Sequence, residues 1–266
     1  MKTGNWRSYD GLDGLDHDCR CVVADAHGYV WVGSRRRGVS RFDGSHFETF
    51  GVADGLPHTH VRCLALGGDG ALWIGTEGGG LARHKDGAFA SFGERHGLAD
   101  GRVRCVLPAD DGTVWVGTRQ GLFRFDGDSF RPIALPEAAR DSNIRGLLVD
   151  DVGSLWVAAS SSGLYRYRDG EMTPDTSCPA LRDGESLCLA QDHSGHVWVG
   201  TRRAGIFRRA DGQWARRGSH EGLPLDDISC LRVASSGDLW IGAHHSGLVR
   251  YDGSGFHAVT TRGGLA

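Results

Sequence analysis

The segment Gly70-Ala71-Leu72-Trp73-Ile74-Gly75-Thr76 decides the fold, because close copies of it recur along the whole chain. Its tryptophan stands in the same context at six positions, which are Trp31, Trp73, Trp115, Trp156, Trp198 and Trp240. The intervals between them are 42, 42, 41, 42 and 42 residues. A glycine stands three residues before each tryptophan, and a glycine, an aliphatic residue and an arginine follow at nearly constant distances. Six copies at this period indicate a repeat protein.

Each repeat predicts four short strands. In the second copy they span residues 61–66, 72–76, 81–84 and 89–92, and glycine-containing turns separate them. Such strands form antiparallel meanders. A single four-stranded sheet cannot bury both of its faces, whereas six sheets stacked radially can, and they leave only short edges. We therefore predict an all-β fold, a six-bladed β-propeller of four-stranded antiparallel blades, as a single domain over residues 1–266.

The predicted repeats span approximately residues 16–57, 58–99, 100–140, 141–182, 183–224 and 225–266. Residues 1–15 resemble the fourth strand of a repeat and the turn after it, as seen in residues 45–56. We expect this N-terminal segment to be the closing strand that completes the last blade, with the C-terminal candidate strand at 255–259 displaced. The alternative is that the chain is one portion of a longer propeller.

Composition narrows the class of partner. Of the 266 residues, 39% are apolar and 24% are charged, and no apolar run reaches the length of a membrane span, so we expect no membrane insertion. Thirty basic against 33 acidic residues give a net charge of −3, which predicts no nucleic-acid partner. The start at Met1 shows no secretory signal, which predicts a cytoplasmic protein if Met1 is the natural start. An extracytoplasmic location is expected if the chain is a fragment of a sensor kinase.

Cysteines share one position in the first strands of five repeats. These are Cys21, Cys63, Cys105, Cys188 and Cys230, and Gly146 takes the position in the remaining copy. We expect them to lie between blades as compact apolar groups, too far apart for disulfides. Cys19 and Cys178 lie outside this pattern and are the expected accessible thiols.

The repeat also carries a family resemblance. The segment 70–76, followed by Gly80-Leu81-Ala82-Arg83, and the Gly-Leu of Asp54-Gly55-Leu56 resemble two-component-regulator propeller repeats. This resemblance implies a sensory module of hybrid histidine kinases or regulators, usually extracytoplasmic, that binds saccharides or other small ligands. A more distant resemblance to the streptogramin lyases implies catalytic groups on one face of the propeller.

Arginines are the main candidates for binding a ligand. In a propeller, the loops before the first strand and after the second strand emerge on one face, where a binding site is expected. Arg20, Arg62, Arg104 and Arg145 share one position in four first strands. Their guanidinium groups suit carboxylate or phosphate ligands. Further candidates on this face are Arg36, Arg102, Arg119, Asn143, Glu185, Arg202 and Asp227.

The alternative for these arginines is structural, and we favour it. Each first-strand arginine would then pair with a loop aspartate beside it, namely Asp18, Asp100 or Asp141, and lock neighbouring blades together. The six arginines that recur in the third strands, at 41, 83, 124, 166, 208 and 250, are expected to belong to the scaffold.

Histidines on the same face offer a metal site. His17, His58, His60 and His244 fall on blades one, two and six, and imidazoles converging there would bind a divalent metal with an open position for water or substrate. The chain has 13 histidines, so clustering by chance is expected, and solvated loop histidines are the favoured interpretation.

We expect a binding or sensory module rather than an enzyme. It would recognise a small polar or anionic ligand, or a signalling protein, at the loop face of the central channel. Two alternatives stay open: a metal-assisted lyase or hydrolase of the streptogramin-lyase type, and a protein-interaction scaffold.

Overall fold

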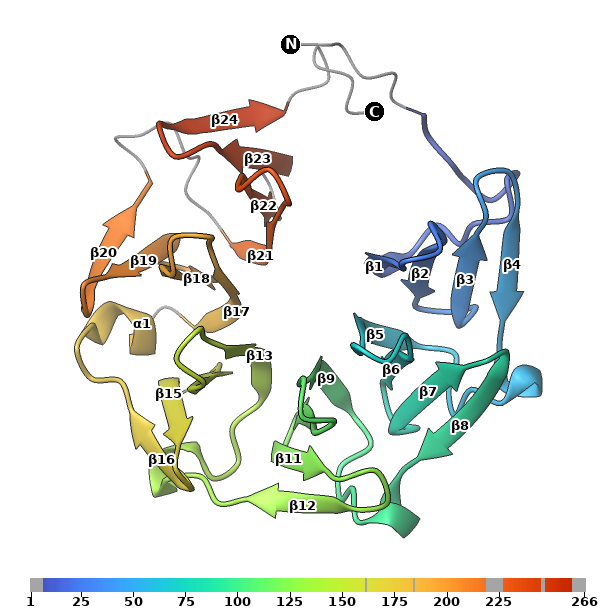
Figure 1. Cartoon of the computed structure of the whole chain (residues 1–266), viewed down its shortest axis with the longest axis horizontal. Helices are drawn as coiled ribbons and strands as arrows, with labels where there is room; N and C mark the ends of the chain where they lie inside the picture. Colours follow the sequence, from blue (N-terminus) through green and yellow to red (C-terminus); the bar gives the residue numbers. More distant parts are fainter. Residues whose placement is uncertain (1–6, 161, 184, 219–226, 245–246, 260–266) are drawn as a thin grey trace. The chain divides into compact units, whose positions relative to one another are not determined.

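The six repeats form six antiparallel sheets in the computed structural model, which describes residues 7–160, 162–183, 185–218, 227–244 and 247–259. In each sheet four strands pair in the order of the chain, and we call the sheets blades 1 to 6 (Figure 1). The predicted strands of the second copy agree with the observed ones to within one residue. The chain divides into two compact units, residues 9–135 with blades 1–3, and residues 136–266 with 1–8, which hold blades 4–6.

The first unit contains three blades joined by short 3-10 helices. Blade 1 has β1 (Cys19–Ala24), β2 (Val30–Ser34), β3 (Val39–Phe42) and β4 (Phe47–Phe50). Blade 2 has β5 (Val61–Leu66), β6 (Leu72–Thr76), β7 (Leu81–Lys85) and β8 (Ala88–Phe92). Blade 3 has β9 (Val103–Pro108), β10 (Val114–Thr118), β11 (Gly121–Phe125) and β12 (Phe130–Ile133). The helices η1 (Val52–Asp54) and η2 (Glu94–His96) connect them, and η3 (Glu137–Ala139) precedes blade 4.

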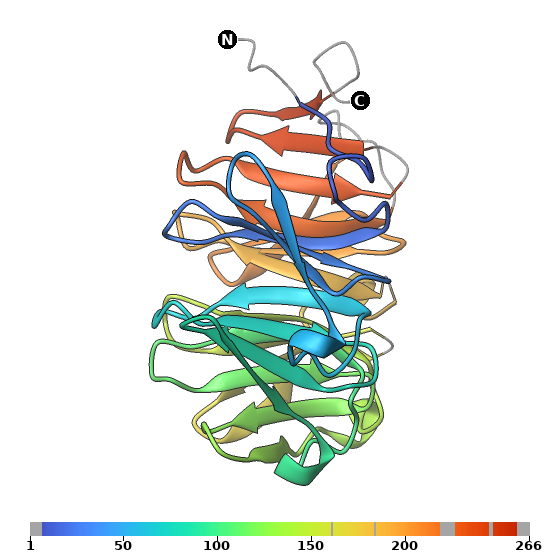
Figure 2. The same cartoon turned by 90° about the vertical axis from the view of Figure 1, so that its right-hand side faces the viewer.

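The second unit repeats this arrangement. Blade 4 has β13 (Ile144–Val149), β14 (Leu155–Ala159), β15 (Gly163–Arg168) and β16 (Glu171–Pro174), followed by α1 (Pro179–Asp183). Blade 5 has β17 (Ser186–Gln191), β18 (Val197–Thr201), β19 (Ile206–Ala210) and β20 (Gln213–Arg217). Blade 6 has β21 (Ile228–Val233), β22 (Leu239–Ala243), β23 (Gly247–Tyr251) and β24 (Phe256–Val259). Figure 2 shows the sheets from the side. No helix among the described residues is long and apolar enough to cross a membrane.

The apolar core of each unit lies between successive blades. Trp31 of blade 1 packs with Val61 and Ile74 of blade 2, and Trp73 of blade 2 packs with Val103 and Phe125 of blade 3. Equivalent clusters join blades 4 and 5 and blades 5 and 6. Within each unit, successive sheets cover one another's faces with the same apolar residues of each repeat. This packing explains why those residues recur at a constant period in the sequence.

The shared cysteine position is explained by its partner across the sheet. Cys188 on β17 pairs in register with Gly200 on β18, and a Cβ added to Gly200 would lie 2.5 Å from the Cys188 sulfur. Four further blades pair cysteine with glycine in the same way. Burial raises the pKa of Cys188, and it raises that of Cys105 to about 12. All seven cysteines are free thiols; Cys19 is exposed, as expected, and Cys178 is half-buried.

The recurring third-strand arginines belong to the scaffold, as expected. Each lies opposite the repeat tryptophan across the sheet, as in the pair Trp73 and Arg83. The guanidinium carbon lies 5.6 to 5.9 Å from the centre of the tryptophan ring in the first five blades. These are cation–π contacts that cover one face of the ring.

The expected displacement of the C-terminal strand is wrong. The segment Phe256–Val259 is β24 and pairs with β23 as the fourth strand of blade 6. Its own repeat already supplies the aromatic residues that pack there, since the Phe256 ring lies against the Tyr251 ring at a ring-centre distance of 4.7 Å. Within the expected closing strand, residues 7–15 form no strand and contain a turn at 11–14, and residues 1–6 lie outside the described residues.

Candidate functional site

A backbone hydrogen bond recurs at one end of all six blades and places two side chains beside each other. The residue that follows the second strand donates its N–H to the carbonyl oxygen of the residue that precedes the first strand, over 2.9 to 3.1 Å. The pairs are Arg35 with Asp18, Glu77 with His60, Arg119 with Arg102, Ser160 with Asn143, Arg202 with Glu185, and His244 with Asp227. We call them the tip pairs. Since their backbone is the same in every blade, they differ only in side-chain chemistry.

The predicted first-strand arginines occupy a β-bulge next to each tip pair. In every blade the pairing of the first strand with the second skips one residue, and the skipped residues are Arg20, Arg62, Arg104, Arg145, Leu187 and Ser229. A bulge leaves its extra residue outside the hydrogen-bond ladder and re-aims the side chain. This local geometry brings the arginines to the same end of the blades as the tip pairs.

Glu77 joins two of these arginines across blades 2 and 3. Its Oε2 accepts hydrogen bonds from Arg62 Nε and from Arg104 Nη1, each over 2.5 Å, and its Oε1 accepts from Arg104 Nη2 over 3.2 Å. Burial acts to raise the pKa of Glu77, but the hydrogen bonds and charges of the two arginines outweigh it and hold the pKa below its ordinary value. Glu77 is therefore ionised at neutral pH and locks the two blades together.

Two loop aspartates neutralise further arginines. Asp18 lies 3.0 Å from Arg20 and 3.7 Å from Arg35. Asp100, whose side chain is 5% exposed, accepts a hydrogen bond from Arg102 Nε over 2.9 Å. The predicted pairing of Arg20 with Asp18 is therefore confirmed, whereas Arg104 pairs with Glu77 instead of Asp100.

Positive charge remains on the tips of blades 1–3 after this pairing. The set contains the six arginines Arg20, Arg35, Arg62, Arg102, Arg104 and Arg119, and the three carboxylates of Asp18, Glu77 and Asp100. Six minus three leaves a surplus of three positive charges. Arg119 is exposed, and among the described residues no carboxylate lies within ion-pair distance of it. Arg36 is also exposed, and its backbone N–H donates to Asp16.

The tips of blades 4–6 are closer to electrical balance. Arg202 lies 3.3 Å from Glu185 and 4.0 Å from Asp227, and Arg203 lies 3.5 Å from Glu185. The bulge residue is an arginine in blade 4, Arg145, but a leucine in blade 5 and a serine in blade 6. The Oδ1 of Asn143 is buried without a hydrogen-bond partner among the described residues. The larger positive surplus therefore lies on the tips of blades 1–3.

The predicted histidines do not assemble a metal centre. His58 Nδ1 accepts the backbone N–H of His60 over 2.9 Å, and the His17 ring lies against the backbone of Gly11. Burial, and then the charge of Arg62, lower the pKa of His60, so its ring is neutral at pH 7. No group of three or more His, Cys, Asp or Glu side chains that could hold a metal ion occurs in the described part of the chain.

Eight members of the tip pairs are among the site residues predicted from the sequence, but their pairing was not predicted. The bridging role of Glu77 was not predicted either. The signal was present, because Glu77 is the one acidic residue among the six that follow a second strand.

Comparison with known proteins supports the repeat type and the fold. The family model named two component regulator propeller matches residues 55–78, 97–120 and 180–203. The extracellular domain of a protein named as a hybrid two component system from B. thetaiotaomicron is 17% identical with a TM-score of 0.76, covering 92% of this chain and 35% of that one. The chain thus spans about a third of that relative. No curated protein matches the sequence.

Two smaller proteins share the fold over most of their length. A catalytically inactive virginiamycin B lyase from Staphylococcus aureus with quinupristin is 15% identical, with a TM-score of 0.77 and coverage of 91% of this chain and 83% of that one. YCF48 bound to D1 peptide is 13% identical, with a TM-score of 0.66 and coverage of 94% and 83%. Together with the six four-stranded blades, these similarities confirm the six-bladed β-propeller class.

Proposed function

We propose that the protein is a sensory or interaction module that binds a small anionic ligand at the tips of blades 1–3. The observation that carries the proposal is the surplus of three positive charges in the set of six arginines and three carboxylates. A guanidinium group offers planar, paired donors that match the oxygens of a carboxylate or phosphate. The ligand class is therefore a small molecule or peptide end that carries such a group.

The arginines fall into two roles. Arg62 and Arg104 are held by Glu77, and Arg104 is only 13% exposed, so they fix the surface and contribute charge. Arg35, which is 52% exposed, and Arg119 have guanidinium groups that can reach a ligand. A site whose inner arginines are already ordered loses little conformational entropy when the ligand binds.

The relatives support a binding role. One is an extracellular domain of a two-component system and another was solved with a peptide, so related propellers serve in sensing and in partner recognition. The first relative also favours the extracytoplasmic location over the cytoplasmic one for this chain.

Calorimetric titration with citrate and with inorganic phosphate at low ionic strength tests the proposal. We expect binding that weakens as salt is added, because exposed charges are screened. Arg119→Gln removes a charged donor worth about 1.5–3 kcal/mol and should weaken binding about tenfold or more. The matched control is Arg131→Gln on β12, where the side chain is 76% exposed and far along the sheet from the first strand. Absence of binding to both anions, or unchanged affinity in Arg119→Gln and Arg35→Gln, would refute the proposal.

A further inference from the structure

Three blades build the same cradle for a carboxylate beneath the repeat tryptophan. An aspartate six residues before the tryptophan accepts the indole N–H on its Oδ2 over 2.8 Å, in the pairs Asp25 with Trp31, Asp150 with Trp156, and Asp192 with Trp198. The Oδ1 of the same aspartate accepts two backbone N–H groups of the following turn. In three blades, therefore, this position below the tryptophan holds a carboxylate.

Blade 2 keeps the tryptophan and lacks the carboxylate. Gly67 takes the aspartate's position, and a Cβ built on it would lie 3.5 Å from Trp73 Nε1. Asp69 accepts one backbone N–H, that of Ala71, over 3.1 Å, but its Oδ2 is bound by Arg83 at 3.0 Å and Lys85 at 2.7 Å. Among the described residues, no acceptor is hydrogen-bonded to the indole N–H of Trp73.

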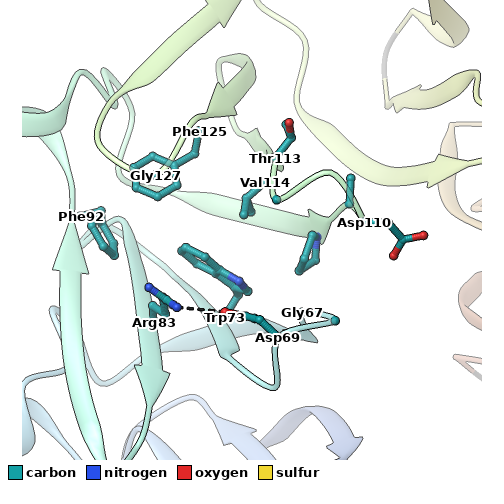
Figure 3. Close-up of a pocket in the computed structure, with 14 residues that line it drawn as sticks. Gly67, Asp69, Trp73, Arg83, Phe92, Asp110, Thr113, Val114, Phe125 and Gly127 are labelled. Carbon is teal, nitrogen blue, oxygen red and sulfur yellow. Dashed lines mark hydrogen bonds and ion pairs between the residues drawn. The ribbon is translucent and has the colours of Figure 1, made fainter.

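A cavity of about 410 Å³ opens at this place, between blades 2 and 3. In Figure 3 the Trp73 side chain lies in the middle of it, with Phe92 to the left, Phe125 above and the Arg83–Asp69 contact below. Ala109, on the opposite wall, occupies the cradle position of blade 3, so that carboxylate is missing as well. The volume lies within the range of small-molecule sites, about 300–1,000 Å³.

The charges around the cavity are balanced, with Arg83 and Lys85 against Asp69 and Asp110. Asp69 is neutralised by two cations, Arg83 and Lys85, which leaves that cluster with one positive charge. Arg83 Nε is buried and has no hydrogen-bond partner, so the guanidinium keeps unused donor capacity. The one remaining acidic residue of the lining, Asp110, is exposed at the rim.

We propose that this cavity binds a small carboxylic acid with an apolar body, whose carboxylate takes the place of the aspartate that blade 2 lacks. One carboxylate oxygen accepts the Trp73 indole N–H, and Arg83 supplies the compensating charge. The apolar body packs against Phe92, Phe125 and Pro108. The site lies at the opposite end of the strands from the tip pairs, because it is formed by the turns between first and second strands. It is therefore independent of the function proposed above.

Titration of ¹⁵N-labelled protein with benzoate tests this site through the indole N–H signals. The chain has 8 tryptophans, and Trp73→Phe identifies the signal of Trp73. We expect benzoate to move that signal downfield, as a new charge-assisted hydrogen bond requires, and benzamide, its uncharged analogue, to move it far less. Arg119→Gln should leave this response unchanged, which separates the site from the tips. Equal responses to benzoate and benzamide, or none to benzoate, would overturn the proposal.

Gly67→Asp provides the decisive variant. The Gly67 backbone is not left-handed, and the nearest atom to an added Cβ is Asp69 Oδ1 at 2.7 Å, the end of a side chain that can turn away if its hydrogen bond to Ala71 is given up, so the blade should fold. An internal carboxylate should shift the Trp73 signal without ligand and weaken benzoate binding about tenfold or more. Ala234→Asp, at the same repeat position of blade 6, is the matched control and should bind benzoate like the parent protein. A folded Gly67→Asp protein with parental affinity would contradict the proposal.

Discussion

Gly200→Ala should destabilise blade 5 through steric overlap alone. The new Cβ would lie 2.5 Å from Cys188 Sγ and 2.6 Å from Ile228 Cγ2, whereas ordinary contacts between such atoms lie near ~3.5–4 Å. The Gly200 backbone is not left-handed, so the substitution adds no backbone strain. Overpacking of this kind costs about 1–3 kcal/mol, and two simultaneous overlaps place the expected loss near about 3 kcal/mol.

Blade 4 shows how the overlap can be relieved. There Ala158 replaces the glycine, and Gly146 replaces the cysteine opposite it. The neighbouring blade's first-strand residue is also smaller, because Ser186 stands where blade 6 has Ile228. Cys188→Gly alone should cost about 2 kcal/mol through lost burial and the flexibility of glycine. In the double variant Cys188→Gly/Gly200→Ala, however, the sulfur no longer meets the new methyl group.

The two changes should therefore be coupled by about 2 kcal/mol, so that the double variant loses about 3 rather than about 5 kcal/mol. Urea titration followed by tryptophan fluorescence measures the free energies of unfolding of all four proteins. Gly68→Ala is the control, because its Cβ would meet no atom within 4 Å, and it should change stability by less than about 0.5 kcal/mol. Additive losses, within about 0.5 kcal/mol, would refute the argument that Cys188 and Gly200 share one space.

Two further predictions concern aspartates near the repeat tryptophans. Asp150→Ala should cost about 3 kcal/mol in urea titration, because it leaves the indole N–H of the 1% exposed Trp156 and the backbone N–H of Ser154 unpaired. Asp111→Ala, which removes one backbone hydrogen bond in an exposed turn, should cost about 1 kcal/mol or less. Equal losses of stability in Asp150→Ala and Asp111→Ala would contradict the stabilising role of the hydrogen bond between Asp150 and Trp156. The hydrogen bond from Lys85 lowers the pKa of Asp69 to about 2, so its stabilising effect is complete above about pH 4 and is lost as the pH falls toward 2. The parent protein should be more stable than Asp69→Asn by less than about 1 kcal/mol, because the Asp69 side chain is 48% exposed. This difference in unfolding free energy should shrink as the pH falls from about 4 to about 2. A difference that grows on acidification would contradict the prediction.

Much of the fold could be predicted from the sequence because its determinants are local and repeated. The tryptophans, the turn glycines and the third-strand arginines recur in all six copies, and each marks a fixed place in the blade. The end of the chain was harder, since two segments matched the pattern of a fourth strand and only the pairing of β24 with β23 distinguishes them.

The sequence predicts where the site lies on the blades, but it does not predict which carboxylate pairs with which arginine. The loops were expected at one end of the blades, and the tip pairs do lie there. Which carboxylate an arginine selects depends on the bulge and on the neighbouring blade. Arg104 on β9 therefore reaches back to Glu77 of blade 2, whereas the aspartate nearer in sequence, Asp100, binds Arg102. These ion pairs depend on how neighbouring repeats pack against each other, so the pattern within one repeat does not predict them.

Departures from the repeat separate into two kinds, and the difference indicates where function lies. In blade 4 the exchange of Gly146 and Ala158 is compensated, because the bulk removed from one strand reappears on its partner and packing is preserved. At Gly67 the compensation is incomplete, since Asp69 takes over the backbone N–H of Ala71 but no acceptor among the described residues binds the Trp73 indole. The incomplete compensation leaves the Trp73 indole N–H without an internal acceptor in the described part of the chain, at the wall of an open cavity. The Trp73 cavity is therefore where an outside carboxylate would restore what the other blades supply from within.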